Sequence, residues 1–185
     1  MPVNKNIKSS LYKRYKKEVI PVLKKEMELE NIHEMPGIEK VVVNMGLKKA
    51  VEEKAVLEEA LEDMAAITGQ KPVITKAKKS ISNFGVREGD VIGCKVTLRG
   101  ERMYDFLNKT LRIAIPRIRD FSGIKRSIDH NGNLTIGIKD ETIYPEINSD
   151  KIKFIKGLSI VVVTSMPEKE KSERMYELLN FPFKK

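Results

Sequence analysis

The sequence predicts an α+β fold in which a mainly antiparallel sheet of about five strands is covered on one face by helices. Two observations lead to this fold class. Short runs rich in Val and Ile, typical of strands, recur along the chain. Between them lie segments whose apolar residues recur every three or four positions, typical of amphipathic helices. A chain of 185 residues can bury one core, and no repeat or linker divides it. We therefore expect a single domain over residues 1–185.

The first helix is expected from Leu11 to about Met27, after a disordered tip. Its apolar residues lie mostly four apart and lysines occupy the other faces. Pro21 either kinks this helix or divides it in two. The stretch from Ile38 to Met45 then reads as a strand. Its three consecutive valines, Val41 to Val43, predict burial on both faces.

The strongest helical pattern runs from Glu52 to Thr68, and Gly69 is expected to stop it. Its apolar stripe consists of Val56, Leu57, Ala60, Leu61, Met64 and Ile67. Its outer face is acidic, with Glu52, Glu53, Glu58, Glu59, Glu62 and Asp63. Because acidic side chains repel RNA, this face should point to solvent or to a basic partner.

The centre of the chain, Lys71 to Met103, reads as a strand (Pro72–Thr75), a long basic loop and a second, alternating strand (Val91–Arg99). Hairpin loops usually have about 2–5 residues, so a loop over residues 76–88 is too long for a simple turn and is expected to be functional. Phe84 lies near its tip. It is either an apolar anchor for an unpaired base or sugar, or a residue folded onto the domain.

The remaining elements follow from the same patterns. We expect a helix from Glu101 to about Ile115, ended by Pro116, and a second long loop over residues 117–133. Strands are expected at Leu134–Ile138 and Leu158–Thr164, with an extended edge over residues 142–147. A last helix should run from Pro167 to about Leu179, with Phe181-Pro182-Phe183 packed back on the body.

The positive charge of the chain is concentrated in its middle third. The net charge is +9, and residues 71–126 hold 14 Lys and Arg against 5 Asp and Glu, which equals the whole excess. Such a localised field favours a polyanionic partner, nucleic acid in particular, although a solubilising surface is the simpler alternative. No apolar run reaches the ~18 residues of a membrane span, and no signal core precedes the body. We therefore expect a cytoplasmic protein.

No constellation suited to catalysis or metal binding is visible in the sequence. His33 and His130 lie in turn-like segments without a motif. Cys94 is the single cysteine and lies in an alternating strand, where it should be a small core thiol. We expect no enzyme activity, no cofactor, no metal and no small-molecule substrate. Binding to another molecule remains as the function. Amide or hydroxyl groups suited to the 2′-hydroxyls or base edges of RNA are present on Asn44, Gln70, Thr97 and Ser80. Asn44 alternatively forms a turn.

Several strings of the chain resemble one known family. They are EKVVVNMG, ITGQKPVITKAKKSISNFGVREGDVIGCKVTLRGERMYDFL, IAIPRIRDFSG, PEINSDKI and NFPFKK. They are similar to the fifth family of bacterial large-subunit ribosomal proteins, which binds 5S rRNA in the central protuberance. The resemblance covers nearly the whole chain.

The resemblance implies partners and site residues. The partners would be 5S rRNA, 23S rRNA, P-site tRNA and neighbouring ribosomal proteins, including one in the head of the small subunit; no membrane is involved. By matching position, the residues contacting 5S rRNA would be Asn44, Gln70, Thr97 and Arg99. The tRNA-contacting loop would present Lys76, Lys78, Lys79, Ser80, Asn83, Phe84 and Arg87. The side facing the intersubunit bridge would carry Arg117, Arg119, Lys125 and Arg126.

The chain departs from the family pattern at two places. Gly46 to Ala50 reads GLKKA where the family has GVGEA, so Lys48 and Lys49 either add RNA contacts or solvate a turn. Ile128 to Asn133 reads IDHNGN, without the aromatic residue and the arginine of the family. Two other function classes remain as rivals, namely an RNA-processing enzyme and a free regulatory nucleic-acid binder.

Overall fold

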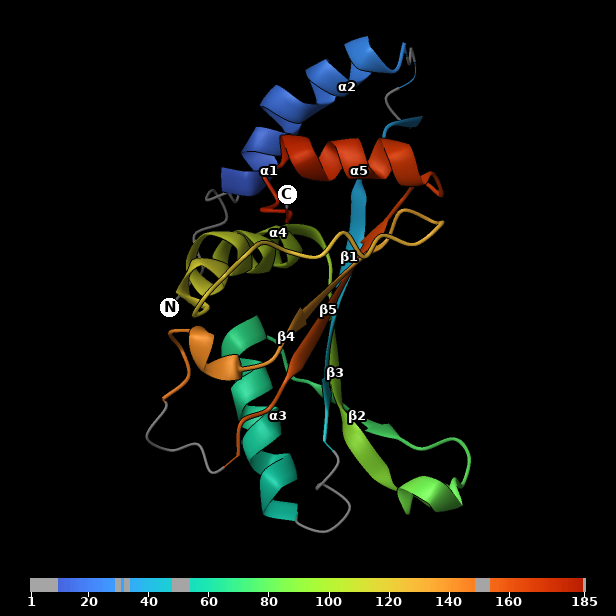
Figure 1. Ribbon diagram of the computed structural model, residues 1–185, viewed down its shortest axis with the longest axis vertical. Coiled ribbons are helices and arrows are strands. Elements are labelled where there is room, and N and C mark those ends of the chain that lie inside the picture. The colour runs from blue at the N-terminus through green and yellow to red at the C-terminus, as the bar shows by residue number, and fades with distance from the viewer. Residues whose placement is uncertain (1–9, 29–30, 32–33, 48–53, 149–153, 185) are drawn as a thin grey trace. The chain divides into compact units, whose positions relative to one another are not determined.

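A computed structural model describes residues 10–28, 31, 34–47, 54–148 and 154–184 (Figure 1). Its strands are β1 (Ile38–Gly46), β2 (Val73–Lys76), β3 (Val91–Leu98), β4 (Leu134–Ile138) and β5 (Leu158–Thr164). Its α-helices are α1 (Ser10–Arg14), α2 (Ile20–Glu26), α3 (Lys54–Thr68), α4 (Gly100–Lys109) and α5 (Lys169–Leu178). Single turns are η1 (Tyr15–Val19) and η5 (Thr110–Ala114), both π, and η4 (Ser82–Phe84), η6 (Ile115–Arg117) and η7 (Glu141–Ile143), all 3-10.

The strands form one five-stranded sheet in the order β2-β3-β1-β5-β4. The edge strand β2 pairs antiparallel with β3, with Val73 opposite Lys95 and Ile74 opposite Cys94. The predicted α+β class, with about five strands, is confirmed. The expected boundaries of β2, β3, β4 and β5 agree with the observed strands to within one residue.

The chain forms two compact units, each made of separate stretches. The first unit comprises Met1–Val41, Arg99–Ile136 and Val161–Lys185; the second comprises Val42–Leu98 and Gly137–Ile160. The strands β1, β4 and β5 therefore each contribute residues to both units.

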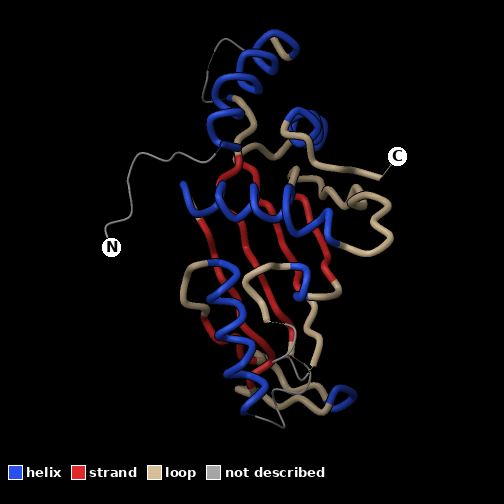
Figure 2. The backbone as a smooth tube through the Cα atoms, turned by 90° about the vertical axis from the view of Figure 1, so that its left-hand side faces the viewer, coloured by secondary structure: helices blue, strands red, loops and turns tan. Residues whose placement is uncertain are grey.

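In the second unit, α3 lies across one face of the strands (Figure 2). The predicted stripe of α3 is buried at Val56, Ala60, Met64 and Ile67. The Cys94 thiol of β3 lies 4.0 Å from the Ala60 carbonyl oxygen, so Cys94 is the core thiol that the sequence predicts. The start expected at Glu52 lies outside the described residues.

Burial along β1 corrects the expectation for its three valines. Val41 and Val43 are fully buried, whereas Val42 between them is half-buried. Successive side chains of a strand point to opposite faces, and only one face of this sheet carries a described helix in the second unit. The strand is therefore buried on one face, and the prediction of burial on both faces is wrong.

The acidic face of α3 has a partner that the sequence did not reveal. Lys156, which precedes β5, is buried, and its ammonium Nζ lies 2.7 Å from Glu59 and 2.8 Å from Asp63. The same ammonium donates to Glu141 at 3.2 Å. Part of this face is thus neutralised within the unit, and of the two expected environments, solvent or a basic partner, Glu59 and Asp63 have the basic partner.

The expected extended edge over residues 142–147 is also wrong. Residues Glu141–Ile143 form the 3-10 turn η7, because the Asp140 carboxylate accepts a hydrogen bond from the Thr142 N–H at 2.8 Å and caps the turn. The turn buries Glu141 completely against Lys156.

In the first unit, Pro21 does not divide the N-terminal helix in two. It lies in the first turn of α2, and the preceding turn η1 is widened, so that the Ile20 N–H bonds to the Tyr15 carbonyl five residues back. Proline has no N–H, and its ring clashes with the carbonyl four residues earlier; a π-turn relieves that conflict. The same arrangement recurs at η5, where Ile115 bonds to Thr110 just before Pro116.

The C-terminal part of the first unit packs around Tyr176 of α5. Its hydroxyl donates to the Gly132 carbonyl at 3.0 Å, and Phe181 packs edge-on against its ring. Gly132 has φ +76°, and a Cβ there would lie 2.2 Å from Ser172 Oγ, so the close approach requires glycine. Phe183 forms a β-bridge with Ile124, which confirms that the tail packs back on the body.

Candidate nucleic-acid interface

In the second unit, the face of the sheet opposite α3 carries polar side chains in place of a described helix. Asn44 is exposed between the buried Val43 and Met45, and Thr97 is half-buried between the buried Val96 and Leu98. The alternation of a strand therefore directs Asn44 and Thr97 away from α3. Because β1 and β3 are neighbours in the sheet, the structure brings these two residues onto one face. We call this surface the open face.

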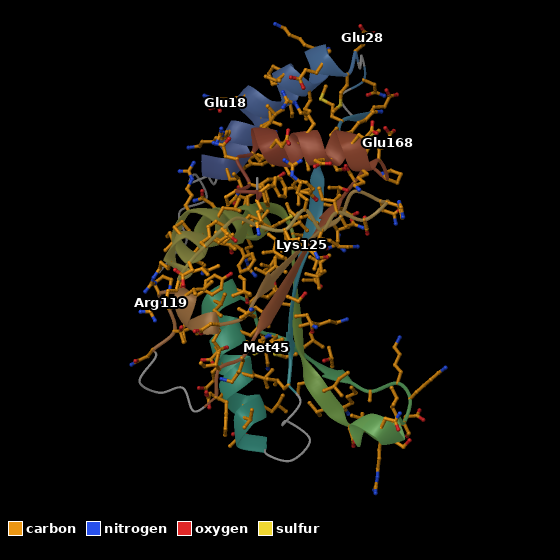
Figure 3. The ribbon with its side chains drawn as sticks, viewed as in Figure 1. Glu18, Glu28, Met45, Arg119, Lys125 and Glu168 are labelled. Carbon is orange, nitrogen blue, oxygen red and sulfur yellow. The ribbon has the colours of Figure 1, made fainter. Side chains whose placement is uncertain are left out.

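Gly93 allows β3 to pack closely against β1. A Cβ at Gly93 would lie 2.2 Å from the Met45 carbonyl oxygen and 3.2 Å from Gly46 Cα, and Gly93 itself is buried. No side chain fits there. Figure 3 labels Met45 of β1. Glycine is required at this position because the backbone of the neighbouring strand approaches it closely.

Gln70 is fastened to the same surface. Its side-chain Nε2 donates to the Thr97 carbonyl oxygen at 3.2 Å. The amide oxygen of Gln70 has no partner among the described residues. Neither has the side chain of Asn44, so the open face offers donors and acceptors that the described protein does not use.

Arg99 follows Thr97 by two residues and belongs to the first unit. It is extended (φ −138°, ψ 160°) and precedes the first turn of α4. Its guanidinium Nη1 lies 3.1 Å from Glu39 Oε1, both side chains being about half exposed. An exposed pair of this kind contributes little stability; it orients the guanidinium, whose other nitrogens remain available.

The basic loop after β2 is an ordered extension of the hairpin. Ile81 and Val86 form a β-bridge around the turn η4, and Ala77 bonds to both Asp90 and Gly89. The Ser80 hydroxyl accepts a hydrogen bond from the Glu88 N–H at 2.9 Å, so Ser80 fastens the loop across its width. The side chain of Phe84 lies outside the described residues, and its two interpretations stay predictions.

The loop concentrates unpaired positive charge. Each of its cationic side chains is exposed and has no carboxylate partner within the part of the chain that the structure describes. They are Lys76, Lys78, Lys79 and Arg87, with the exposed amide of Asn83 among them. Asp90 uses one carboxylate oxygen to accept from the Arg87 N–H at 2.7 Å. The loop thus presents cations in a defined backbone frame.

The four basic residues expected on the bridge side do not share one environment. Arg117, Arg119 and Lys125 are exposed without a described partner; Figure 3 labels Arg119 and Lys125. Arg126 instead pairs with Glu173 and Glu177 of α5, and its guanidinium lies 5.3 Å from the centre of the Phe183 ring. Arg126 is therefore already paired within the first unit, unlike the other three.

Sequence reasoning missed Lys95. Its side chain is exposed on β3 and belongs to the open face, since it alternates with the buried Cys94 and Val96. The spacing Lys95, Thr97, Arg99 would have revealed it, because residues two apart share a face of a strand. The open face therefore combines a cation with neutral donors and acceptors, which suits a sugar–phosphate backbone.

The described residues offer little else in the way of chemistry. No group of three or more His, Cys, Asp or Glu among them could hold a metal ion, and burial raises the pKa of the Cys94 thiol to about 11. None of the helices in those parts of the chain has the length and hydropathy of a membrane span. Lys48 and Lys49 of the GLKKA segment lie outside the described residues.

Comparison with known families gives two matches that together cover most of the chain. Residues 31–87 match the family described as ribosomal protein L5. Residues 91–183 match a second family, described as the C-terminus of the same ribosomal protein family.

Individual relatives match over nearly their full length, and each is named large ribosomal subunit protein uL5. The protein from Syntrophomonas wolfei is 47% identical over 175 residues, covering 94% of this chain and 98% of the relative. The protein from Thermoanaerobacter sp. is 49% identical over 178 residues, covering 96% of this chain and 99% of the relative. The chain therefore belongs to the ribosomal protein L5 family, and the expectation of a non-enzymatic, cytoplasmic ribosomal protein is confirmed.

Proposed function

We propose that this structural ribosomal protein binds 5S rRNA in the central protuberance of the large subunit through its open face. Asn44, Gln70 and Thr97 would make the contacts, with Arg99 following in the chain. The observation that carries the proposal is the presence of Asn44 and Thr97 on one uncovered face, next to the exposed Lys95. The shallow minor groove of A-form RNA displays 2′-hydroxyls, which such donors and acceptors recognise.

The basic loop, in this proposal, contacts P-site tRNA. Four cations that have no carboxylate partner among the described residues lie on an ordered hairpin extension, and they can bind a phosphate backbone without rearranging the sheet. The fastening by Ser80 and the Ile81–Val86 bridge lowers the conformational entropy lost on binding. The loop would therefore act separately from the open face.

The exposed bridge-side cations Arg117, Arg119 and Lys125 would face 23S rRNA and a protein in the head of the small subunit. Arg126 has a smaller part in this contact, because two carboxylates of α5 already neutralise it. Variants of Arg126 should consequently affect stability more than assembly.

Titration of labelled 5S rRNA with the full chain tests the proposal. Asn44→Ala combined with Thr97→Val should weaken binding roughly tenfold, since each lost hydrogen bond contributes about 0.5–1.5 kcal/mol. Lys95→Ala should lower the salt dependence by about 0.7–0.9 in log–log slope. Lys139→Ala, which removes an exposed cation of the same unit, is the matched control. An excess of duplex DNA should not compete; equal competition would favour the free regulatory binder.

The loop and the open face can be separated in the same assay. Lys78→Ala with Lys79→Ala should leave 5S rRNA binding within about twofold and weaken the contact with P-site tRNA in reconstituted ribosomes. Loss of 5S rRNA binding in this loop variant, with the open-face variant unaffected, would overturn the assignment of the two surfaces.

A further inference from the structure

We infer that the outer edge of β2, together with the groove beside it, docks an extended acidic segment of a partner protein as an additional strand. The two end strands of the sheet differ. Beside β4, Ile128 forms a bridge with Leu134, and the Thr135 N–H donates to the Ser127 carbonyl at 3.0 Å. At the other end of the sheet, β2 lies outside β3 (Figure 1), and no described residue bonds to the outer side of β2. This docking goes beyond the proposed RNA contacts and does not depend on them.

The edge of β2 offers both backbone groups and apolar side chains. In an antiparallel pair, every second residue of the end strand directs its N–H and C=O outward, where another strand can bond to them. Val73 is 61% exposed and lies opposite Lys95, so its side chain is on the open face. Ile74 is 41% exposed and lies opposite the buried Cys94, on the side of α3. An extended peptide can pair with the backbone and cover both side chains, whereas RNA has no amide backbone to continue the sheet.

A groove of about 530 Å³ lies between α3 and β2, within the second unit. Ile74 lines it from β2, Leu61 and Ala65 line it from α3, and Pro72 precedes the strand. Pro72 is buried, but Leu61 and Ala65 are only half-buried and Ile74 is more exposed than either. The apolar surface of this groove is therefore in contact with solvent. Successive side chains of a strand point to opposite faces, so every second side chain of a segment paired with β2 would enter the groove.

The charge along the edge selects an acidic partner. Lys71 and Lys76 flank β2, are exposed and have no carboxylate partner in the part of the chain that the structure describes. They lie about 17 Å apart along the strand, at about 3.3 Å per residue. Carboxylates five residues apart on an added strand can therefore pair with both lysines. A second copy of this chain would instead bring lysines of two β2 edges together, together with Lys78 and Lys79 of both loops, and like charges on paired strands repel.

The test is an NMR titration of the isotope-labelled full chain with the blocked peptide EVTVTE, whose glutamates have the spacing of Lys71 and Lys76. The peptide should shift the backbone amides of β2 and slow the hydrogen exchange of every second one. A peptide of the same sequence with methylated backbone nitrogens cannot donate to the β2 carbonyls and should bind roughly tenfold more weakly. The peptide KVTVTK should also bind roughly tenfold more weakly, because its lysines meet Lys71 and Lys76.

Two variants test the groove and the charge. Ala65→Arg fills the groove and should weaken the binding of EVTVTE roughly tenfold, since a valine of the peptide is then no longer buried. Ala66→Arg is the matched control, because Ala66 is the next residue of α3, is exposed and does not line the groove; it should bind the peptide as the wild type does. Lys71→Glu should weaken the binding of EVTVTE and strengthen that of KVTVTK.

Three outcomes would overturn the inference. The first is no binding of EVTVTE by the wild type up to about 1 mM. The second is equal binding of EVTVTE by Ala65→Arg and Ala66→Arg, or equal binding of EVTVTE and KVTVTK by the wild type. The third is a dimer in sedimentation that Ala65→Arg abolishes, which would make a second copy of this chain the occupant. Titration of 5S rRNA separates this inference from the proposed function: if that binding stays sensitive to Asn44→Ala, only the docking at β2 fails.

Discussion

Replacement of Lys156 by methionine should strongly destabilise the second unit. The side chain of Lys156 is 3% exposed, and its ammonium lies within 3.2 Å of three carboxylates, on Glu59, Asp63 and Glu141. Methionine fills similar space but leaves those carboxylates without their cation, and Glu141 is fully buried with Oε2 already unpartnered. Removing one member of a buried ion pair costs about 3–5 kcal/mol. For a chain of this size, where about 1 kcal/mol shifts Tm by about 2–4 °C, Tm should fall by roughly 10 °C.

Urea and thermal unfolding at neutral pH measure this effect, with Lys139→Met as the control because Lys139 is exposed in the same unit. The loss of unfolding free energy in Lys156→Met should shrink as the pH falls, since protonation removes the repulsion among the carboxylates. A loss below about 1 kcal/mol, or one that does not depend on pH, would refute the view that Lys156 neutralises this face of α3.

Three further predictions concern single sites. Burial raises the pKa of Glu141 to about 7, although Lys156 acts in the opposite direction. The folded state therefore holds this proton more tightly than the unfolded state. The free energy of unfolding should consequently fall as the pH rises from about 4.5 to about 7. Urea titrations should show that the free energy of unfolding of Glu141→Gln rises by up to about 3 kcal/mol relative to that of the wild type over this pH interval. A difference between the two proteins that does not change with pH would contradict this. Gly132→Ala should lower the free energy of unfolding by about 2–4 kcal/mol through strain and the clash with Ser172, whereas Gly137→Ala, with open space, should change it by less than about 0.5 kcal/mol. The Cys94 thiol should react with a disulfide reagent at about pH 8 only at the rate of unfolding; immediate reaction would show that it is accessible.

Local periodicity predicted most elements because the apolar pattern and the turn residues of each lie within one short stretch. The hairpin β2–β3 and helices α4 and α5 are of this kind. Some failures were local, such as the turn that Asp140 caps at Glu141–Ile143, and others concern partners distant in sequence. Lys156 is 93 residues from Asp63, and the pairing of Arg126 with Glu173 spans 47 residues, so no window of the sequence contains either pair.

For the candidate site, too, the sequence predicted what a single strand determines and not what depends on contacts between strands. Alternation along β3 is a local property, so the sequence predicts that Thr97 and Cys94 lie on opposite faces. The three valines of β1 hid its alternation, and the surface position of Asn44 follows only from the assembled sheet. The hydrogen bond from Gln70 to Thr97 and the close approach of Gly93 to the backbone of Met45 depend on how strands meet. Those features arise only in the assembled sheet.

The two π-turns explain an unusual spacing in the helices that contain them. The core-facing residues of the first helix lie at intervals of four: Leu11, Tyr15, Val19 and Leu23. Tyr15 is half-buried and the other three are buried. At roughly 100° per residue, three such steps in a regular α-helix would carry Leu23 about 120° away from Leu11. The widened turn at η1 takes up one extra residue and reduces this drift. Met103, Leu107, Leu111 and Ile115 repeat the pattern around η5. Each helix therefore behaves as a regular helix with a single-residue insertion, and the phase of its core-facing residues is kept on both sides of the π-turn.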